Sequence, residues 1–258
     1  MARSPRYTNV SYSFGPGPLS PAIKLLIIIN VAVFLAMLVL PDGAALQIVR
    51  TFGFRPDSVL GQVALWQFAT YMFLHGGIGH VLFNMLGLWM FGTELERMWG
   101  TRFFTKYYFV TGVGAAAITL LWSLSPLRAA DELYYSVMIG ASGAVYGVLL
   151  AYGLAFPNRP IYLYLLFPIP AKYFVMIVGA IAYLSTATGD GGGVAHTAHL
   201  GGLVVGYLYL KGLRIHPLSE LKYRWLRWRM MRARGKFNVY SGGRDDDQWK
   251  SDWKKHIH

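Results

Sequence analysis

Six stretches of the chain are almost entirely apolar, and polar or charged residues separate each stretch from the next. A continuous apolar run of about 20 residues can cross the hydrocarbon core of a bilayer as an α-helix. The pattern therefore predicts six transmembrane helices, of which the fifth is the shortest. They cover residues 23–40, 78–95, 103–121, 137–156, 171–187 and 195–213.

The composition agrees with several membrane spans rather than one anchor. Of the 258 residues, 55% are hydrophobic and only 14% are charged, whereas soluble domains carry about 25% charged residues. The first run is long and lacks a small-residue cleavage site, so it is predicted to be a retained span and not a signal peptide. We expect an all-α, polytopic membrane bundle in residues 23–213, a disordered leader in 1–22 and a basic tail in 214–258.

Basic residues lie in alternate connections between the apolar runs. Connections rich in Lys and Arg remain on the cytoplasmic side of a membrane, so the pattern places both termini in the cytoplasm, as an even number of spans also requires. We expect a multi-pass protein of a bacterial inner membrane. The residues that set this orientation are Arg3, Arg6, Lys24, Arg97, Arg102, Lys106, Arg159, Lys172, Lys211 and Arg214.

The formal net charge of +12 also suggests an anionic partner. Much of it lies after Lys211, where arginines alternate with Trp225, Leu226 and Trp228. Such a segment suits a helix on the anionic inner leaflet, and a basic tail that only fixes orientation explains it equally well. We recognise no nucleic-acid-binding module, so membrane lipids and not nucleic acid are the expected partners.

The first outer loop, residues 41–77, is long and has many apolar and aromatic residues. A loop of this length without any structure is unusual. We expect part of it to lie in the outer membrane interface.

Polar side chains inside apolar runs are costly and usually functional. His80 and Asn84 lie one turn apart in the second run, Ser142 lies in the fourth, and His199 lies in the sixth. These three runs point in the same direction, and Ser142 and His199 are each a few residues from the outer end of their run. At 1.5 Å per residue, both are expected at about 6–8 Å below the outer surface. The four side chains are therefore predicted to form one site.

Glycine pairs on the same runs predict close contact between them. Gly143 and Gly147 in the fourth run, and Gly202 and Gly206 in the sixth, follow the small-xxx-small pattern. Such surfaces allow helix backbones to approach closely in a membrane. We expect the contact to bring the serine and the histidine within reach of each other.

These motifs resemble the rhomboid intramembrane proteases. The resemblance rests on Gly140-Ala141-Ser142-Gly143, on Ala198-His199-Leu200-Gly201-Gly202, and on His80 with Asn84 four residues later. It extends over residues 23–213 and includes six spans, a long first loop, and Glu96 followed by Gly100. One departure is Trp66-Gln67, where many relatives have Trp-Arg.

The resemblance implies a serine endopeptidase that cleaves other membrane proteins in or near their transmembrane segments. Ser142 would be the nucleophile and His199 the general base, with Tyr146 packed on the His199 ring. Asn84, His80 and the Ser142 backbone would stabilise the oxyanion, and the turn at Gly140 would support them. The resemblance implies no cofactor and no metal, and the oligomeric state is not predicted.

Three other functions are weighed against this one. A metalloprotease would use His75, His80, His196 and His199, but the sequence has no HExxH motif and no carboxylate beside these histidines. A rhomboid-like protein that only binds membrane clients would typically lack the serine or the histidine. A transporter would be expected to show an inverted repeat or a pair of broken helices.

A substrate helix must unwind to reach a site among helices, because its carbonyls are engaged in internal hydrogen bonds. We predict that the substrate enters beside the short fifth run. It is followed by Thr188-Gly189-Asp190-Gly191-Gly192-Gly193, which is flexible enough to form a lid.

Overall fold

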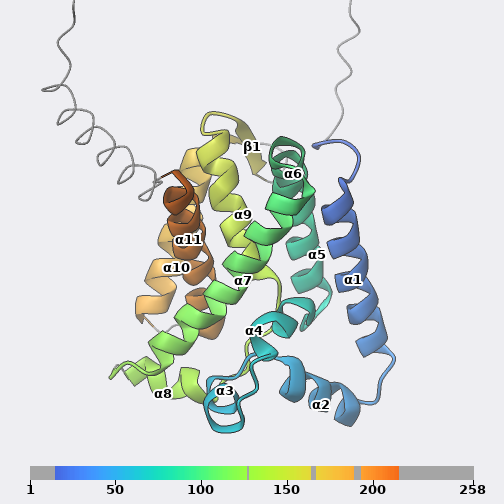
Figure 1. The fold of residues 1–258 in the computed structure, drawn as a ribbon, viewed down its shortest axis with the longest axis vertical. Coiled ribbons are helices and arrows are strands. Elements are labelled where there is room, and N and C mark those ends of the chain that lie inside the picture. The colour runs from blue at the N-terminus through green and yellow to red at the C-terminus, as the bar shows by residue number, and fades with distance from the viewer. Residues whose placement is uncertain (1–14, 127, 164–166, 189–192, 215–258) are drawn as a thin grey trace, which may run out of the picture. The chain divides into compact units, whose positions relative to one another are not determined.

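The computed structural model describes residues 15–126, 128–163, 167–188 and 193–214 (Figure 1). The described part is mostly helical, as predicted, and its long helices pack side by side in one bundle. The predicted lid, the basic tail after residue 214 and the first 14 residues lie outside the described residues. The helices of the bundle are α1 (Pro21–Leu38), α5 (Ile78–Gly87), α6 (Thr93–Trp99), α7 (Thr101–Ser123), α9 (Ser142–Ala155), α10 (Ala171–Thr188) and α11 (Gly193–Arg214).

Each of the six apolar runs coincides with one or more of these helices. Among the described residues, α1 and α7 are long and apolar enough to cross a membrane by themselves, and α9 and most of α10 are shorter apolar helices. The second run is divided into α5, a π-helical turn η2 (Leu88–Gly92) and α6. Gly100, with φ of +80°, then reverses the chain into α7, a conformation that favours glycine.

The prediction for the start of the fourth span was wrong. Residues 137–141 are not helical, and α9 begins at Ser142. Met138 forms an isolated antiparallel bridge with Phe54 of the first loop through two backbone hydrogen bonds of 2.8 and 2.9 Å. Gly140 has a φ of +117°, which α-helices do not accommodate. Pairing with the first loop and this glycine therefore keep the segment extended.

The first loop is folded into short helices at one end of the bundle, shown in Figure 1. They are α2 (Asp42–Phe52), α3 (Pro56–Gln62), α4 (Gln67–Thr70) and the 3-10 turn η1 (Tyr71–Phe73), and α8 (Arg128–Tyr135) lies at the same end. Leu46, Leu60, Leu65 and Trp66 are exposed. The first loop is therefore structured and has exposed apolar side chains, and its place in the membrane interface stays a prediction.

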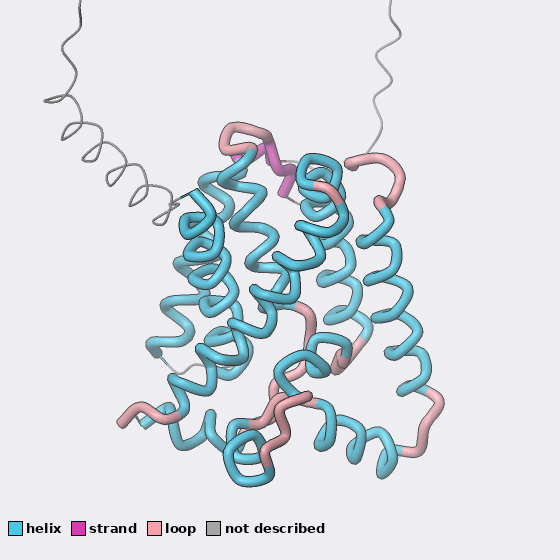
Figure 2. The backbone as a smooth tube through the Cα atoms, in the orientation of Figure 1, coloured by secondary structure: helices cyan, strands magenta, loops and turns pink. Residues whose placement is uncertain are grey.

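The opposite end of the bundle has a small β-hairpin that the sequence analysis did not predict (Figure 2). Strand β1 (Pro160–Leu163) pairs antiparallel with β2 (Phe167–Pro170), and Ile161 lies opposite Ile169. Arg159, just before β1, forms an ion pair with Glu94 of α6. The described structure is thus helical apart from this hairpin and the Phe54–Met138 bridge.

Part of the predicted leader is bound to the bundle. The backbone oxygens of Pro16 and Pro18 accept hydrogen bonds from the Arg97 side chain, and that of Gly17 accepts one of 3.1 Å from the Trp89 indole. The prediction of disorder was therefore wrong for residues 15–22. The sequence pattern missed these contacts because their acceptors are backbone oxygens.

Glu96 is the main polar link at this end. Its carboxylate accepts hydrogen bonds from the backbone N–H groups of Ala22 at 2.8 Å and Ile23 at 3.1 Å, and from the hydroxyls of Ser20 and Thr101. Glu96 is only 2% exposed. A carboxylate at the first turn of α1 satisfies N–H groups that have no partner within the helix. Glu96 therefore joins the start of α1 to the junction of α6 and α7.

Candidate active site

Ser142 lies at the first position of α9, at the end of the extended segment. The N–H of Gly140 donates a 2.9 Å hydrogen bond to the carbonyl oxygen of Tyr71, which holds the turn before Ser142. Ser142 is half-buried and so remains open to small molecules. Because the first N–H groups of a helix have no partner within it, this end of α9 can stabilise negative charge.

Helix α11 packs directly against the first turns of α9. A Cβ atom added to Gly202 would lie 1.9 Å from the carbonyl oxygen of Gly143, and one on Gly206 would lie 3.3 Å from the Cα atom of Gly147. The predicted close contact between the two glycine pairs is confirmed.

The same contact brings His199 to the first turns of α9. The rings of His199 and Tyr146 are stacked, with centroids 4.0 Å apart and an interplanar angle of 4°. Tyr146 is one turn after Ser142, and Gly202 is three residues after His199. The serine and histidine are thus neighbours across the α9–α11 contact. No hydrogen bond joins them among the described residues, and such bonds are often long in enzymes without substrate.

His80 faces the turn before Ser142. A Cβ atom on Gly140 would lie 2.5 Å from the His80 Nε2 atom, so only glycine leaves room for the ring there. The Nδ1 atom of His80 accepts a 3.4 Å hydrogen bond from the N–H of Gly76. Because a neutral imidazole has one donor and one acceptor nitrogen, this bond favours a proton on Nε2. His80 therefore offers a donor toward the backbone at Gly140.

Asn84 is 5% exposed, and its side-chain N–H donates a 2.9 Å hydrogen bond to the carbonyl oxygen of His80. This bond leaves one N–H of its amide for another acceptor. The structure thus brings His80 next to Gly140, and Tyr146 next to His199. Asn84 is placed one turn from His80 on the same helix.

The remaining histidines lie beside this site. The ring of His196 is 5.8 Å from that of His199, and the ring of His75 is 5.0 Å from that of His80. Burial, with a further contribution from His80, lowers the pKa of His75 from 6.5 to about 4, and the nearby Phe73 backbone offsets only part of this shift. His75 is therefore neutral at physiological pH. Among the residues that the structure describes, no group of three or more His, Asp or Glu side chains could hold a metal ion.

Sequence reasoning missed two positions that support the site. Tyr71 is 1% exposed, and its hydroxyl donates a 2.7 Å hydrogen bond to the carbonyl oxygen of Gly112 on α7. Phe54 is fully buried, and its ring lies 6.1 Å from that of Tyr71. Both residues lie in the first loop, where no periodicity marks them. Their aromatic side chains were the only signal that the sequence offered.

Comparisons with known proteins agree with the resemblance. The model of the rhomboid domain matches residues 62–215. Rhomboid protein 1, mitochondrial, of Saccharomyces cerevisiae is 34% identical over 138 residues, which cover 53% of this chain and 38% of the yeast protein. Rhomboid protease AarA of Providencia stuartii is 30% identical over 157 residues, which cover 55% of this chain and 54% of that protein.

Rhomboid protease GluP of Bacillus subtilis is also 30% identical, over 158 residues, which cover 60% of this chain and 27% of that protein. The aligned region is thus about half or less of the length of each of these relatives. The region that the rhomboid-domain model matches, residues 62–215, contains His80, Ser142 and His199. Since the family model matches well over half of the described chain, this protein belongs to the rhomboid family.

Proposed function

We propose that the protein is an intramembrane serine endopeptidase that cleaves other membrane proteins in or near their transmembrane segments. The observation that carries the proposal is the packing of the His199 ring on Tyr146, one turn beyond a serine at the start of a helix. Relatives that are named rhomboid proteases support it.

The proposed reaction begins when His199 removes the proton from the Ser142 hydroxyl as its oxygen attacks the scissile carbonyl carbon. The carbonyl oxygen becomes an oxyanion, which the Ser142 N–H, the His80 ring and the Asn84 amide stabilise. His199 then gives the proton to the leaving amine as the peptide bond breaks. Water, deprotonated by His199, attacks the acyl-enzyme ester and releases the carboxylic acid with Ser142 restored.

Each group has a separate part in this scheme. Stacking on Tyr146 fixes the His199 ring without a carboxylate, so the pair acts as a dyad. Loss of one preorganised oxyanion donor typically costs about 3–4 kcal/mol of transition-state stabilisation. The donors lie on α5 and α9, and therefore the packing of the bundle positions them before substrate arrives.

We further propose six spans with both termini on the cytoplasmic side, as the basic residues predict. The loop with α2, α3 and α4 then lies on the outer side, and the β-hairpin on the cytoplasmic side. We propose a bacterial plasma membrane as the location, which the relatives from Bacillus and Providencia support. The yeast relative, by contrast, is named as a mitochondrial protein. Expected partners are transmembrane protein substrates and lipids.

The test is cleavage of a model transmembrane substrate by purified protein, together with labelling by a fluorophosphonate. Ser142→Ala and His199→Ala should each abolish cleavage, and Ser142→Ala should also abolish labelling. Ser136→Ala, which changes a serine six residues earlier, is the matched control and should retain both. Thermal melts check that the variants fold.

Normal cleavage by either dyad variant would exclude this mechanism. If the wild-type protein neither cleaves nor becomes labelled but retains bound membrane proteins, the client-binding alternative would replace the proposed one.

A further inference from the structure

The first loop contains a pocket that has no part in the proposed chemistry. Its volume is about 400 Å³, which falls in the range of about 300–1,000 Å³ that is common for small-molecule sites. Residues of α2 and α3 and the start of α4 line it. The pocket is therefore formed by the loop itself, and neither Ser142 nor His199 lines it.

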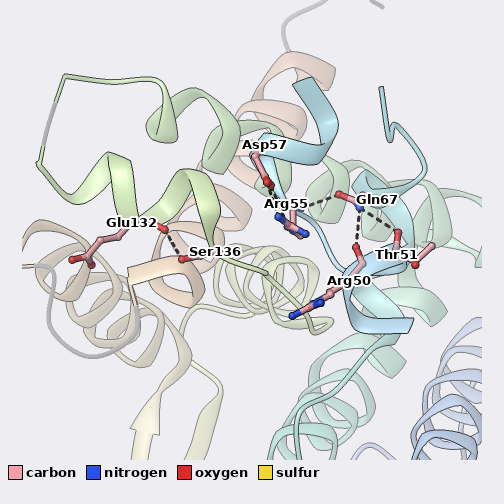
Figure 3. Close-up of polar contacts among 7 residues, drawn as sticks. All are labelled: Arg50, Thr51, Arg55, Asp57, Gln67, Glu132 and Ser136. Carbon is pink, nitrogen blue, oxygen red and sulfur yellow. Dashed lines mark hydrogen bonds and ion pairs between the residues drawn. The ribbon is translucent and has the colours of Figure 1, made fainter. Parts of the chain in front are cut away.

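Arg50 gives the pocket an uncompensated positive charge. Figure 3 shows its side chain directed away from Gln67, whose amide nitrogen contacts Arg50 only at the backbone oxygen. The guanidinium group makes no ion pair or hydrogen bond with the described residues. Arg55, by contrast, is bound to Asp57 through two hydrogen bonds of 3.1 and 2.5 Å. The lining thus has one cation that is free for a ligand.

Neutral hydrogen-bond donors line the same pocket. Ser58 lines the pocket and is only 4% exposed, yet its hydroxyl has no partner among the residues described. The hydroxyl oxygen keeps some exposure to the pocket, so it is available to a ligand. The exposed amides of Gln47 and Gln62 also line the pocket. A guanidinium group with hydroxyl and amide donors suits the oxygens of a phosphate.

The rim of the pocket is apolar. Leu46 and Trp66 both line it and are each 50% exposed. The Trp66 indole N–H is already bound to the Thr51 backbone oxygen at 2.9 Å, so its ring presents an apolar surface. Tryptophan at this position is typical of the membrane–water interface. A ligand with both a phosphate and acyl chains would occupy the polar and the apolar parts together.

We propose that this pocket binds the phosphate group of a phospholipid from the leaflet in which the loop lies. Arg50 and Ser58 bind the phosphate oxygens, and the acyl chains lie over Leu46 and Trp66. Free phosphate shares the anionic chemistry but would leave the apolar rim uncovered.

A lipid bound here would act on a loop that is bonded to the candidate active site. Phe54, which immediately precedes Arg55, pairs with Met138 four residues before Ser142. The N–H of Gly140 also donates a hydrogen bond to the carbonyl oxygen of Tyr71 in the loop. The pocket and the turn that holds Ser142 therefore share one connected piece of backbone.

The test uses the purified full chain in a neutral detergent and a photoreactive phosphatidylglycerol with a diazirine near its headgroup. Cross-links are mapped by mass spectrometry to residues 43–67. Arg50→Gln removes the charge from an exposed side chain. Arg102→Gln removes an exposed arginine from α7 and is the matched control. Neither change touches the proposed dyad, and the binding readout does not require protease activity.

Cross-linking to residues 43–67 should fall about tenfold in Arg50→Gln, as expected when one charge-assisted hydrogen bond is lost. It should be unchanged in Arg102→Gln. Unlabelled phosphatidylglycerol should compete, and diacylglycerol with the same chains should not. Equal cross-linking in Arg50→Gln and wild type would overturn the proposal. Displacement by inorganic phosphate alone, or by an acidic peptide, would assign the pocket to that ligand instead.

Discussion

Gly202→Ala is expected to separate the two helices on which the proposed dyad depends. The added methyl would lie 1.9 Å from the Gly143 carbonyl oxygen and 2.8 Å from its carbonyl carbon. Both atoms belong to the backbone, so no side-chain rotation can relieve the contact. The change must therefore move α11 relative to α9 beside Ser142 and His199.

The size of the movement follows from the geometry. Cβ atoms essentially never approach other heavy atoms within 3.0 Å, so the backbones must separate by about 1 Å, the difference between 3.0 and 1.9 Å. A misplacement of about 1 Å can lower a reaction rate about 100-fold, which corresponds to about 2.7 kcal/mol in the barrier.

Stability should change less than activity. Overpacking typically costs about 1–3 kcal/mol, and alanine gains about 1 kcal/mol over glycine in helix propensity. We therefore expect kcat for a transmembrane substrate to fall about 100-fold with a modest decrease in Tm. Labelling of Ser142 by a fluorophosphonate should also become slower.

Gly212→Ala is the matched control in the same helix. A Cβ atom there meets no described heavy atom within 4 Å, so the change adds helix propensity without a clash. It should retain wild-type turnover. If Gly202→Ala cleaves as fast as wild type and melts at the same temperature, the close α9–α11 contact is not needed for activity. Equal losses in both variants would point to helix stiffening instead.

Three further changes probe the supports of the fold and site. Glu96→Gln should lower stability by about 1–3 kcal/mol, because the amide cannot accept all the hydrogen bonds of the carboxylate; thermal melts measure it, and an unchanged Tm would contradict the role. The pKa of His75 is about 4 in the folded protein, whereas an ordinary histidine has a pKa of 6.5. The unfolded state therefore binds more protons between these limits, and stability should fall as pH decreases from about 6.5 to about 4. His75→Gln should make stability depend less on pH in this range. Equal pH dependence in the variant and the wild type would exclude His75 as its source. Tyr71→Phe should cost about 1 kcal/mol through the lost bond to Gly112, seen as a lower Tm, whereas a gain in stability would refute it.

Much of the bundle could be predicted because its signal is local in the sequence. The apolar runs mark α1, α7, α10 and α11 closely, and the glycine pairs mark the α9–α11 contact. The start of α9 could not be predicted, because residues 137–141 are as apolar as a helix. Their extended form depends on pairing with Phe54, more than 80 residues earlier in the chain, and hydropathy does not report such a partner.

The candidate site, like the bundle, could be predicted only in part from the sequence. Ser142, His199, His80 and Asn84 were predicted as site residues because polar side chains in apolar runs are conspicuous. The depth calculation was built on a helix that begins too early, and yet His199 does lie against the first turns of α9. It succeeded because α11 positions His199 through the glycine contact, which the sequence marks independently.

Gln67 shows how the departure from the Trp-Arg pattern of many relatives is accommodated. Its side-chain oxygen accepts a 3.0 Å hydrogen bond from the Arg55 N–H, and its amide nitrogen donates to the Thr51 oxygen at 3.2 Å. Arginine has five donors and no acceptor, so it could not satisfy the Arg55 N–H in this way. Gln67 is only 2% exposed, so an arginine at this position would be a buried cation. The nearby carboxylate of Asp57 could not balance that charge, because it already binds Arg55. The neutral amide therefore leaves Arg50 as the free cation of the loop, which is the charge that the proposed lipid site requires.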